Sequence, residues 1–244
     1  MLSPRTLLIR GMLVGLAAGL LAFVIAYLIG EGPVDAAIAF EEAHADPAAA
    51  GEPALVSRTV QSTVGLLTAT LIYGVALGGI FSMVFAGAYG RLGRLGARAT
   101  AALVALAGFV TVALVPWLKY PANPPATGSE ETIGRRTSLF FLMLVIALAA
   151  LALSIYIGRS QVARFGDWNA TILAAVVFVA VIAVAHVLLP SIEEIPDGFS
   201  PLVLWNFRLA SLATQAVVWT TLGLGLGALV ERSLRREAVL TTSA

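Results

Sequence analysis

Six long stretches of apolar residues constrain the fold of this chain more than any other feature. A hydrocarbon core of about 30 Å requires roughly 20 apolar residues in a helix, and each stretch is close to or above that length. They run approximately from Leu7 to Ile29, Gln61 to Ala88, Ala97 to Leu118, Ser138 to Ile157, Thr171 to Leu189 and Leu209 to Val230. The sequence therefore predicts an all-α integral membrane bundle of about six transmembrane helices, forming a single domain over residues 1–244.

The composition supports this class and excludes several functions. Hydrophobic residues make up 59% of the chain and charged residues 12%, whereas about a quarter of the residues of a globular domain are charged. The net charge of +1 and the dispersed arginines give no basic stripe for a nucleic acid. The chain has no cysteine, which rules out disulfides and thiolate metal sites.

Catalytic motifs are also missing from the sequence. Lys119 is the only lysine and does not follow a glycine-rich phosphate-binding loop, so there is no Walker A motif. No apolar stretch carries an H-E-x-x-H motif or a paired acid and base. We therefore predict that the protein is not an enzyme and has no tightly bound cofactor.

The distribution of charge predicts the orientation of the bundle, because short loops rich in Arg and Lys stay in the cytoplasm. With the N-terminus inside, the inner segments hold ten of the fifteen basic residues and three of the fourteen acids. Both termini are thus predicted to be cytoplasmic. The first apolar stretch is longer than the core of a secretory signal, and we expect it to be a retained first span.

A proline-rich stretch, WLKYPANPPATGSEETIGRR, divides the chain between the third and fourth apolar segments. Proline lacks a backbone donor and disfavours helix for itself and for the preceding residue. We therefore predict an extracytoplasmic loop over about 119–137 that joins two three-helix halves, 1–118 and 138–244. The residues that define the loop motif are Trp117, Lys119, Tyr120, Asn123, Arg135 and Arg136.

Glycines recur four residues apart in three of the apolar segments: Gly11, Gly15 and Gly19, then Gly74 and Gly78, then Gly223 and Gly227. Small residues at this spacing allow two membrane helices to approach closely. We interpret these glycines as helix-packing positions.

A first acidic cluster follows the first apolar segment, on a short helix that we expect to begin near Pro33 and end at Pro47. Glu41, Glu42 and His44 lie within one turn, and Asp35 and Asp46 fall on the same face as Glu42. Carboxylates and an imidazole at this spacing suit a divalent metal of the Mn to Zn series. The same pattern also fits a solvated acidic helix at the membrane surface.

A second acidic cluster follows the fifth segment and contains Glu193, Glu194 and Asp197. His186 lies one turn inside the predicted end of that segment. Ionisable residues at this depth usually face a cavity or the interior of the bundle. His186 and the three acids are candidate metal ligands, and the alternative for His186 is a hydrogen-bonded packing role.

Two polar stripes lie within otherwise apolar segments. Arg208, Ser211 and Gln215 follow one another at helical spacing in the sixth segment, and Gln61 and Thr68 lie on one face of the second. Gln215 is too deep to reach water and requires a partner inside the bundle. These residues are candidates for the lining of a permeation pathway or for simple interhelical hydrogen bonds.

Four stretches of the chain, in order, resemble the CbtA family, a predicted cobalt transporter subunit of bacteria that is often found near vitamin B12 functions. They are GEGPVDAAIAFEEA, LIYGVALGGIFSMVFA, PWLKYPANPPATGSEETIGRRTSLF and LPSIEEIPDGFSPLVLWNFRLASLATQAVVW. The resemblance implies Co²⁺ as transported substrate and a small single-span partner, CbtB, that carries a histidine-rich stretch. Members of the family are often described with five spans, one fewer than the six segments counted here.

The leading hypothesis is an uptake permease subunit of the bacterial cytoplasmic membrane. An acidic outer vestibule of Glu41, Glu42, His44, Glu193, Glu194 and Asp197 would concentrate a hydrated divalent cation, and His186 and Gln215 would then replace part of its water shell. The rival hypothesis is a non-transporting membrane scaffold or accessory subunit of a larger complex, in which the acids form a contact surface. Both hypotheses allow a homo- or hetero-oligomer.

Overall fold

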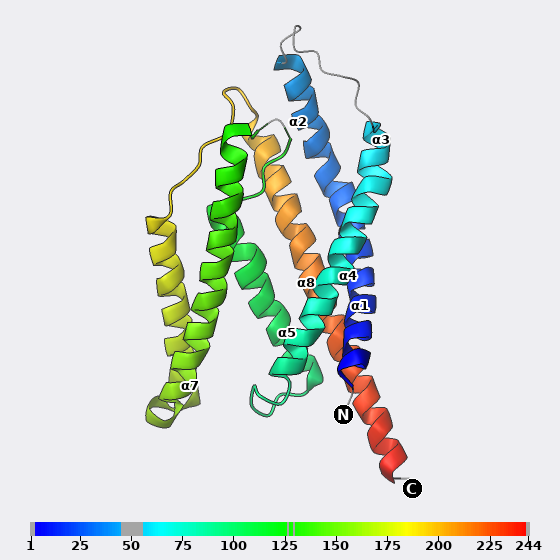
Figure 1. The fold of residues 1–244 in the computed structure, drawn as a ribbon, viewed down its shortest axis with the longest axis vertical. Coiled ribbons are helices and arrows are strands. Elements are labelled where there is room, and N and C mark those ends of the chain that lie inside the picture. Colours follow the sequence, from blue (N-terminus) through cyan, green and yellow to red (C-terminus); the bar gives the residue numbers. More distant parts are fainter. Residues whose placement is uncertain (1–2, 45–55, 126, 129, 243–244) are drawn as a thin grey trace. The chain divides into compact units, whose positions relative to one another are not determined.

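The computed structural model describes residues 3–44, 56–125, 127–128 and 130–242 of the chain. Every regular element in these residues is helical, which confirms the predicted all-α fold (Figure 1). Five helices are long and apolar enough to cross a membrane. The number of crossings and the cytoplasmic orientation of both termini stay predictions.

The first helix is longer than its sequence suggested. α1 (Pro4–Ile25) continues through a π-helical turn (Ala26–Gly30) into α2 (Glu31–His44). Ser3 caps its start by accepting a hydrogen bond from the backbone N–H of Thr6. The prediction of a separate short helix from Pro33 was thus wrong at its start, because a π turn next to a proline adjusts the hydrogen bonding that the proline disrupts. Its predicted end at Pro47, and Asp46, lie outside the described residues.

Two further helical rods carry the second and third apolar segments. The rod with the second apolar segment consists of α3 (Arg58–Val60), a π-helical turn (Gln61–Gly65) and α4 (Leu66–Ala88). The rod with the third consists of α5 (Ala97–Gly108), a π-helical turn (Phe109–Leu114) and α6 (Val115–Lys119). Gly90 and Gly93, with φ of 77° and 76°, turn the chain between these rods. Only glycine adopts this left-handed backbone without a steric cost.

The fourth and fifth apolar segments lie on a single element, α7 (Glu130–Leu188). Gly166 interrupts it with φ 74° and ψ 166°, and α7 folds there into two arms (Figure 1). Met143 and Ala147 on the first arm share one buried cluster with Ile182 and Ala185 on the second. Five continuous helices thus carry the six predicted segments. The sixth segment lies on α8 (Pro201–Thr242).

The loop within the proline-rich stretch is shorter than predicted. Trp117 and Lys119 belong to α6, and Arg135 and Arg136 lie in the first turns of α7. The three prolines of the stretch all precede residue 126, so nothing prevents a helix from Glu130 onward, and a glycine inside a helix costs only about 1 kcal/mol. The loop proper lies between Lys119 and Glu130.

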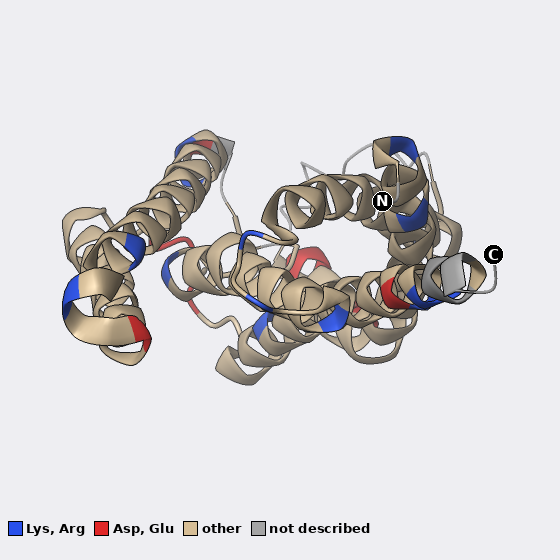
Figure 2. Ribbon diagram, turned by 90° about the horizontal axis from the view of Figure 1, so that it is seen from below, with Lys and Arg blue, Asp and Glu red and all other residues tan. Residues whose placement is uncertain are grey.

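The chain forms two compact units, and the predicted organisation as one domain of two three-helix halves stays a prediction. The first comprises Met1–Phe109 and Pro201–Ala244, and the second comprises Val110–Ser200. In both units many large apolar side chains are exposed on the helices. In Figure 2 the Lys, Arg, Asp and Glu residues form small separate patches on a ribbon that is mostly tan. Exposed apolar helix faces of this length are suited to contact with lipid.

Glycine contacts hold the first unit together. A Cβ atom added to Gly15 on α1 would lie 2.1 Å from the carbonyl oxygen of Gly74 on α4, and one added to Gly78 would lie 2.2 Å from that of Gly11. On α8, Gly223 and Gly227 make similar close contacts with α5. The glycines singled out in the sequence are therefore packing positions at which two helix backbones touch.

Candidate functional site

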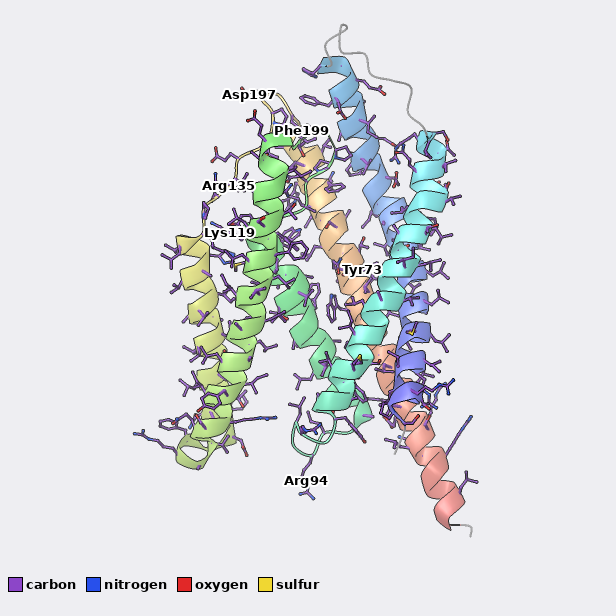
Figure 3. All side chains as sticks on the ribbon, in the orientation of Figure 1. Tyr73, Arg94, Lys119, Arg135, Asp197 and Phe199 are labelled. Atoms are coloured by element: carbon purple, nitrogen blue, oxygen red, sulfur yellow. The ribbon has the colours of Figure 1, made fainter. Side chains whose placement is uncertain are left out.

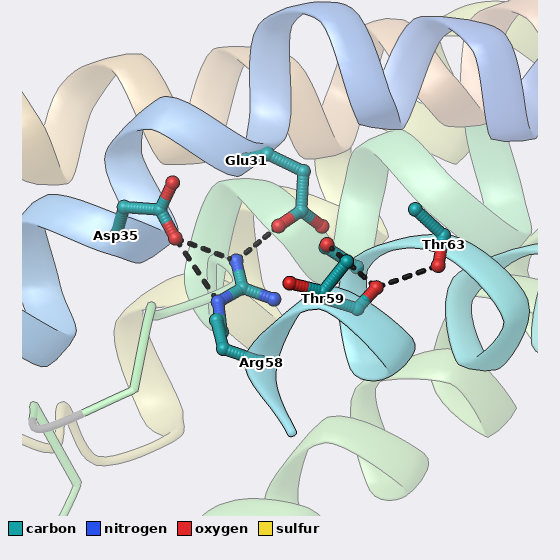
Figure 4. A network of polar contacts seen from close by, with 6 residues as sticks. Glu31, Asp35, Arg58, Thr59 and Thr63 are labelled. Carbon is teal, nitrogen blue, oxygen red and sulfur yellow. Dashed lines mark hydrogen bonds and ion pairs between the residues drawn. The ribbon is translucent and has the colours of Figure 1, made fainter. Parts of the chain in front are cut away.

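An arginine that the sequence analysis did not single out joins two acids in the first unit. Arg58, at the start of α3, forms ion pairs with Glu31 and with Asp35, both on α2 (Figure 4). The Arg58 Nε to Asp35 Oδ1 distance is 3.0 Å. Glu31 and Asp35 are four residues apart and so lie on one helix face. The four-residue spacing of the two acids is visible in the sequence and indicates that they share a helix face. It does not indicate that Arg58, 27 residues from Glu31, pairs with them.

The predicted ligands of the first acidic cluster lie in the last turn of α2. Glu41, Glu42 and His44 are all exposed. His44 Nδ1 lies 2.8 Å from the carbonyl oxygen of Phe40, and the two rings stack with centroids 4.1 Å apart. Because a carbonyl can only accept, Nδ1 carries the proton, and in the neutral ring the lone pair is on Nε2.

The polar stripes of the first unit make contacts that the sequence predicted only in part. Gln215 on α8 does find a partner in the bundle: its Oε1 accepts a hydrogen bond of 3.1 Å from the hydroxyl of Tyr73 on α4. Gln61 donates to the carbonyl of Val56 at 2.9 Å. Thr68 is exposed, and Arg208 and Ser211 are half-buried. Their role as a pathway lining stays a prediction.

We expect the bond between Tyr73 and Gln215 to contribute modestly to stability. Interhelical hydrogen bonds inside membranes average about 0.6 kcal/mol, because the separated helices also find partners. A double-mutant cycle with Tyr73→Phe and Gln215→Leu, measured by thermal unfolding in detergent, should give a coupling energy of about that size. Strictly additive effects of the two substitutions would show that the contact contributes nothing.

His186 is placed near the end of the second arm of α7, in the second unit, and is half-buried. Its Nδ1 lies 3.1 Å from the carbonyl oxygen of Ile182. As in His44, this assigns the proton to Nδ1 and the lone pair of the neutral ring to Nε2. Histidines that bind metals commonly donate their other ring N–H in this way, so the local geometry is compatible with a ligand role.

The loop between α7 and α8, residues 189–200, carries the second acidic cluster and is called the acidic loop below. Three residues of the predicted loop motif contact it. Lys119 Nζ donates to the backbone oxygen of His186 at 2.9 Å and contacts Ser191 Oγ at 3.3 Å. An ammonium group at the C-terminal end of a helix is favourable because the last carbonyls there are unpaired.

Tyr120 makes the next contact. Its hydroxyl donates to the backbone oxygen of Pro190 at 2.8 Å, and its side chain is buried. Burial raises the pKa of the Tyr120 phenol, and the positive charge of Arg135 offsets part of this rise. The phenol therefore stays protonated around neutral pH and keeps its role as a donor.

Arg136 holds the far part of the acidic loop. Its guanidinium donates to Glu194 Oε2 at 3.3 Å and to the backbone oxygen of Pro121. The Glu194 side chain is only 2% exposed. Glu193 and Asp197 are exposed, with Asp197 at the turn of the loop (Figure 3). Of the other motif residues, Arg135 is exposed, and Trp117 and Asn123 are half-buried.

The predicted ligands are divided between the two units. Glu41, Glu42 and His44 belong to the first unit, whereas His186, Glu193, Glu194 and Asp197 belong to the second. Among the residues that the structure describes, no three His, Asp or Glu side chains are grouped as a metal site. The common acidic vestibule stays a prediction.

Comparison with protein families agrees with the resemblance noted in the sequence. The model of a family described as "Probable cobalt transporter subunit (CbtA)" matches residues 4–231. The comparisons with curated proteins and with solved structures found no match. The family match spans nearly the whole chain, including the glycine-packed helices, the proline-rich stretch and the acidic loop. The chain therefore belongs to the CbtA family of probable cobalt transporter subunits.

Proposed function

We propose that this protein is the multi-pass subunit of an uptake system for a divalent metal ion, with Co²⁺ as the transported ion. The observation that carries the proposal is the family match over residues 4–231. The five long apolar helices are consistent with it. The protein would reside in the bacterial cytoplasmic membrane and act with a small, histidine-rich single-span partner of the CbtB type.

The chemistry of the second unit supports a role in capturing the ion. His186 directs the lone pair of its neutral ring to Nε2, and the acidic loop that follows carries three carboxylates. Imidazole nitrogen and carboxylate oxygen are suitable ligands for the Mn to Zn series. These ligands bind Ni²⁺, Cu²⁺ and Zn²⁺ at least as well on the usual affinity order, so the choice of Co²⁺ rests on the family.

The first unit would contribute in a different way. Its exposed Glu41 and Glu42 next to His44 would raise the local concentration of cations near the membrane surface. Glu31 and Asp35 are already neutralised in part by Arg58. We therefore assign the attraction of the ion in this unit to the last turn of α2.

Uptake of radiolabelled Co²⁺ into reconstituted vesicles tests the proposal. We expect uptake above that of protein-free vesicles when this chain and its CbtB partner are present together, and a decrease on addition of excess unlabelled Co²⁺. No uptake with the partner present, combined with stable co-purification in a larger complex, would instead support the scaffold hypothesis.

A further inference from the structure

Glu194 is an enclosed carboxylate with incomplete hydrogen bonding. Its side chain is 2% exposed, and Oε2 contacts Arg136 at 3.3 Å. Its other oxygen, Oε1, is buried and has no hydrogen-bond partner among the described residues. An unpaired buried carboxylate oxygen is unfavourable because it has lost its water without replacement. Glu194 therefore has an unfilled capacity to bind a positive group.

Arg136 is the counter-charge that keeps Glu194 in this position. The guanidinium also donates to the backbone oxygen of Pro121, which fixes it at the start of the proline-rich loop. The contact with Glu194 uses one nitrogen at 3.3 Å, and it is thus longer and weaker than a bidentate arginine–carboxylate pair. A stronger cation could displace it.

The acidic loop contains no helix that a displacement would have to break. Residues 189–200 form no helix in this structure. Three contacts hold the acidic loop. Lys119 at the end of α6 contacts Ser191, and Tyr120 in the proline-rich loop contacts Pro190. Arg136 on α7 contacts Glu194. Arg136 provides the one ion pair among these contacts.

We propose that Arg136 holds the acidic loop in place through its ion pair with Glu194, and that an incoming divalent cation competes with Arg136 for this carboxylate and releases the loop. A dication bound to Glu194 would satisfy Oε1 as well as Oε2, which the single arginine contact does not. The proposal rests on the proposed function only for the identity of the cation. Arg136 is accordingly a positioning residue that acts through Glu194.

The absence of cysteine in the chain permits a direct test. Ile192→Cys places a single thiol in the acidic loop, at a half-buried position between Ser191 and Glu194. The rate of its reaction with a bulky maleimide is measured on the purified full chain in lipid nanodiscs, where both faces are accessible. Adding Arg136→Gln should raise this rate about tenfold, in line with the loss of one charge-assisted hydrogen bond. Arg136→Lys should give a smaller increase.

Arg135→Gln is the matched control, because Arg135 is the neighbouring arginine and its side chain is exposed. We expect this substitution to leave the labelling rate unchanged. Labelling of Ile192→Cys at the same rate with and without Arg136→Gln would overturn the proposal.

Addition of Co²⁺ distinguishes competition from a purely structural contact. Co²⁺ should accelerate labelling when Arg136 and Glu194 are both present, and it should have no effect once Glu194→Gln has removed the carboxylate. Equal acceleration in both proteins, or none in either, would overturn the proposal. If labelling responds as expected but vesicles take up no Co²⁺, the transport function fails and the competition at Glu194 stands.

Discussion

Gly74→Ala is expected to destabilise the first unit severely. The added Cβ would lie 2.3 Å from the backbone oxygen of Gly15 and 2.8 Å from the backbone nitrogen of Gly19. These are backbone atoms of α1, so no side chain can rotate away and the two helices must separate. Overpacking typically costs about 1–3 kcal/mol and occasionally more, and a clash with backbone atoms belongs in the upper part of that range. The thermal unfolding midpoint of the purified protein in detergent should fall accordingly.

Gly87→Ala provides the control on the same helix. Gly87 also lies in α4, but a Cβ atom at this position would meet nothing within 4 Å. Alanine has a higher helix propensity than glycine, so this substitution should be neutral or stabilise by up to about 1 kcal/mol. Equal unfolding midpoints for Gly74→Ala and Gly87→Ala would show that α1 and α4 are not in backbone contact.

His186→Ala is expected to lower the initial rate of Co²⁺ uptake by about 10- to 100-fold. Changes even in the outer shell of a metal site have effects of this size, and His186 is proposed as a direct ligand. The substitution removes the imidazole and leaves the backbone oxygen that accepts from Lys119. The local anchoring of the chain should therefore persist, and the loss should reflect ligation.

Val187→Ala is the matched control for His186→Ala. Val187 is the next residue on α7 and is 84% exposed, so its truncation leaves no cavity and should not change uptake. Uptake by His186→Ala at the rate of the unchanged chain would remove His186 from the proposed ligands.

The class of fold and the glycine positions of close helix contact could be predicted because both depend on local patterns. Apolar runs of about 20 residues identify helices that suit a membrane, and glycines four residues apart indicate close helix contacts. The position of Gln215 in an apolar segment predicted a partner inside the bundle, which is Tyr73. The identity of that partner depends on how α4 and α8 pack, and no local pattern contains this information.

The boundaries of helices near prolines were less predictable. A proline in the first turn of a helix and a proline that follows a π turn look alike in sequence. Pro33 follows the π turn Ala26–Gly30, and Pro116 follows the π turn Phe109–Leu114. The helix continues through Pro33, where the sequence suggested the start of a new helix. It also continues through Pro116, for which the sequence gave no prediction.

The candidate site was predictable as a set of residues and not as a set of contacts. Lys119, Tyr120 and Arg136 were noted in the proline-rich stretch, but nothing in that stretch revealed that they bind the acidic loop. Glu194 lies 58 residues from Arg136 in the chain. An ion pair over this separation depends on the tertiary structure. Because of it, Glu194 is a carboxylate paired with an arginine and not a free acid on the surface.

Locating bound cobalt by anomalous X-ray scattering, in crystals of the protein grown with Co²⁺, tests the central claim most directly. The account predicts a cobalt peak about 2.1 Å from His186 Nε2, with a carboxylate of the acidic loop as a further ligand. Cobalt peaks confined to other parts of the protein, with His186 and the acidic loop unoccupied at saturating Co²⁺, would contradict it.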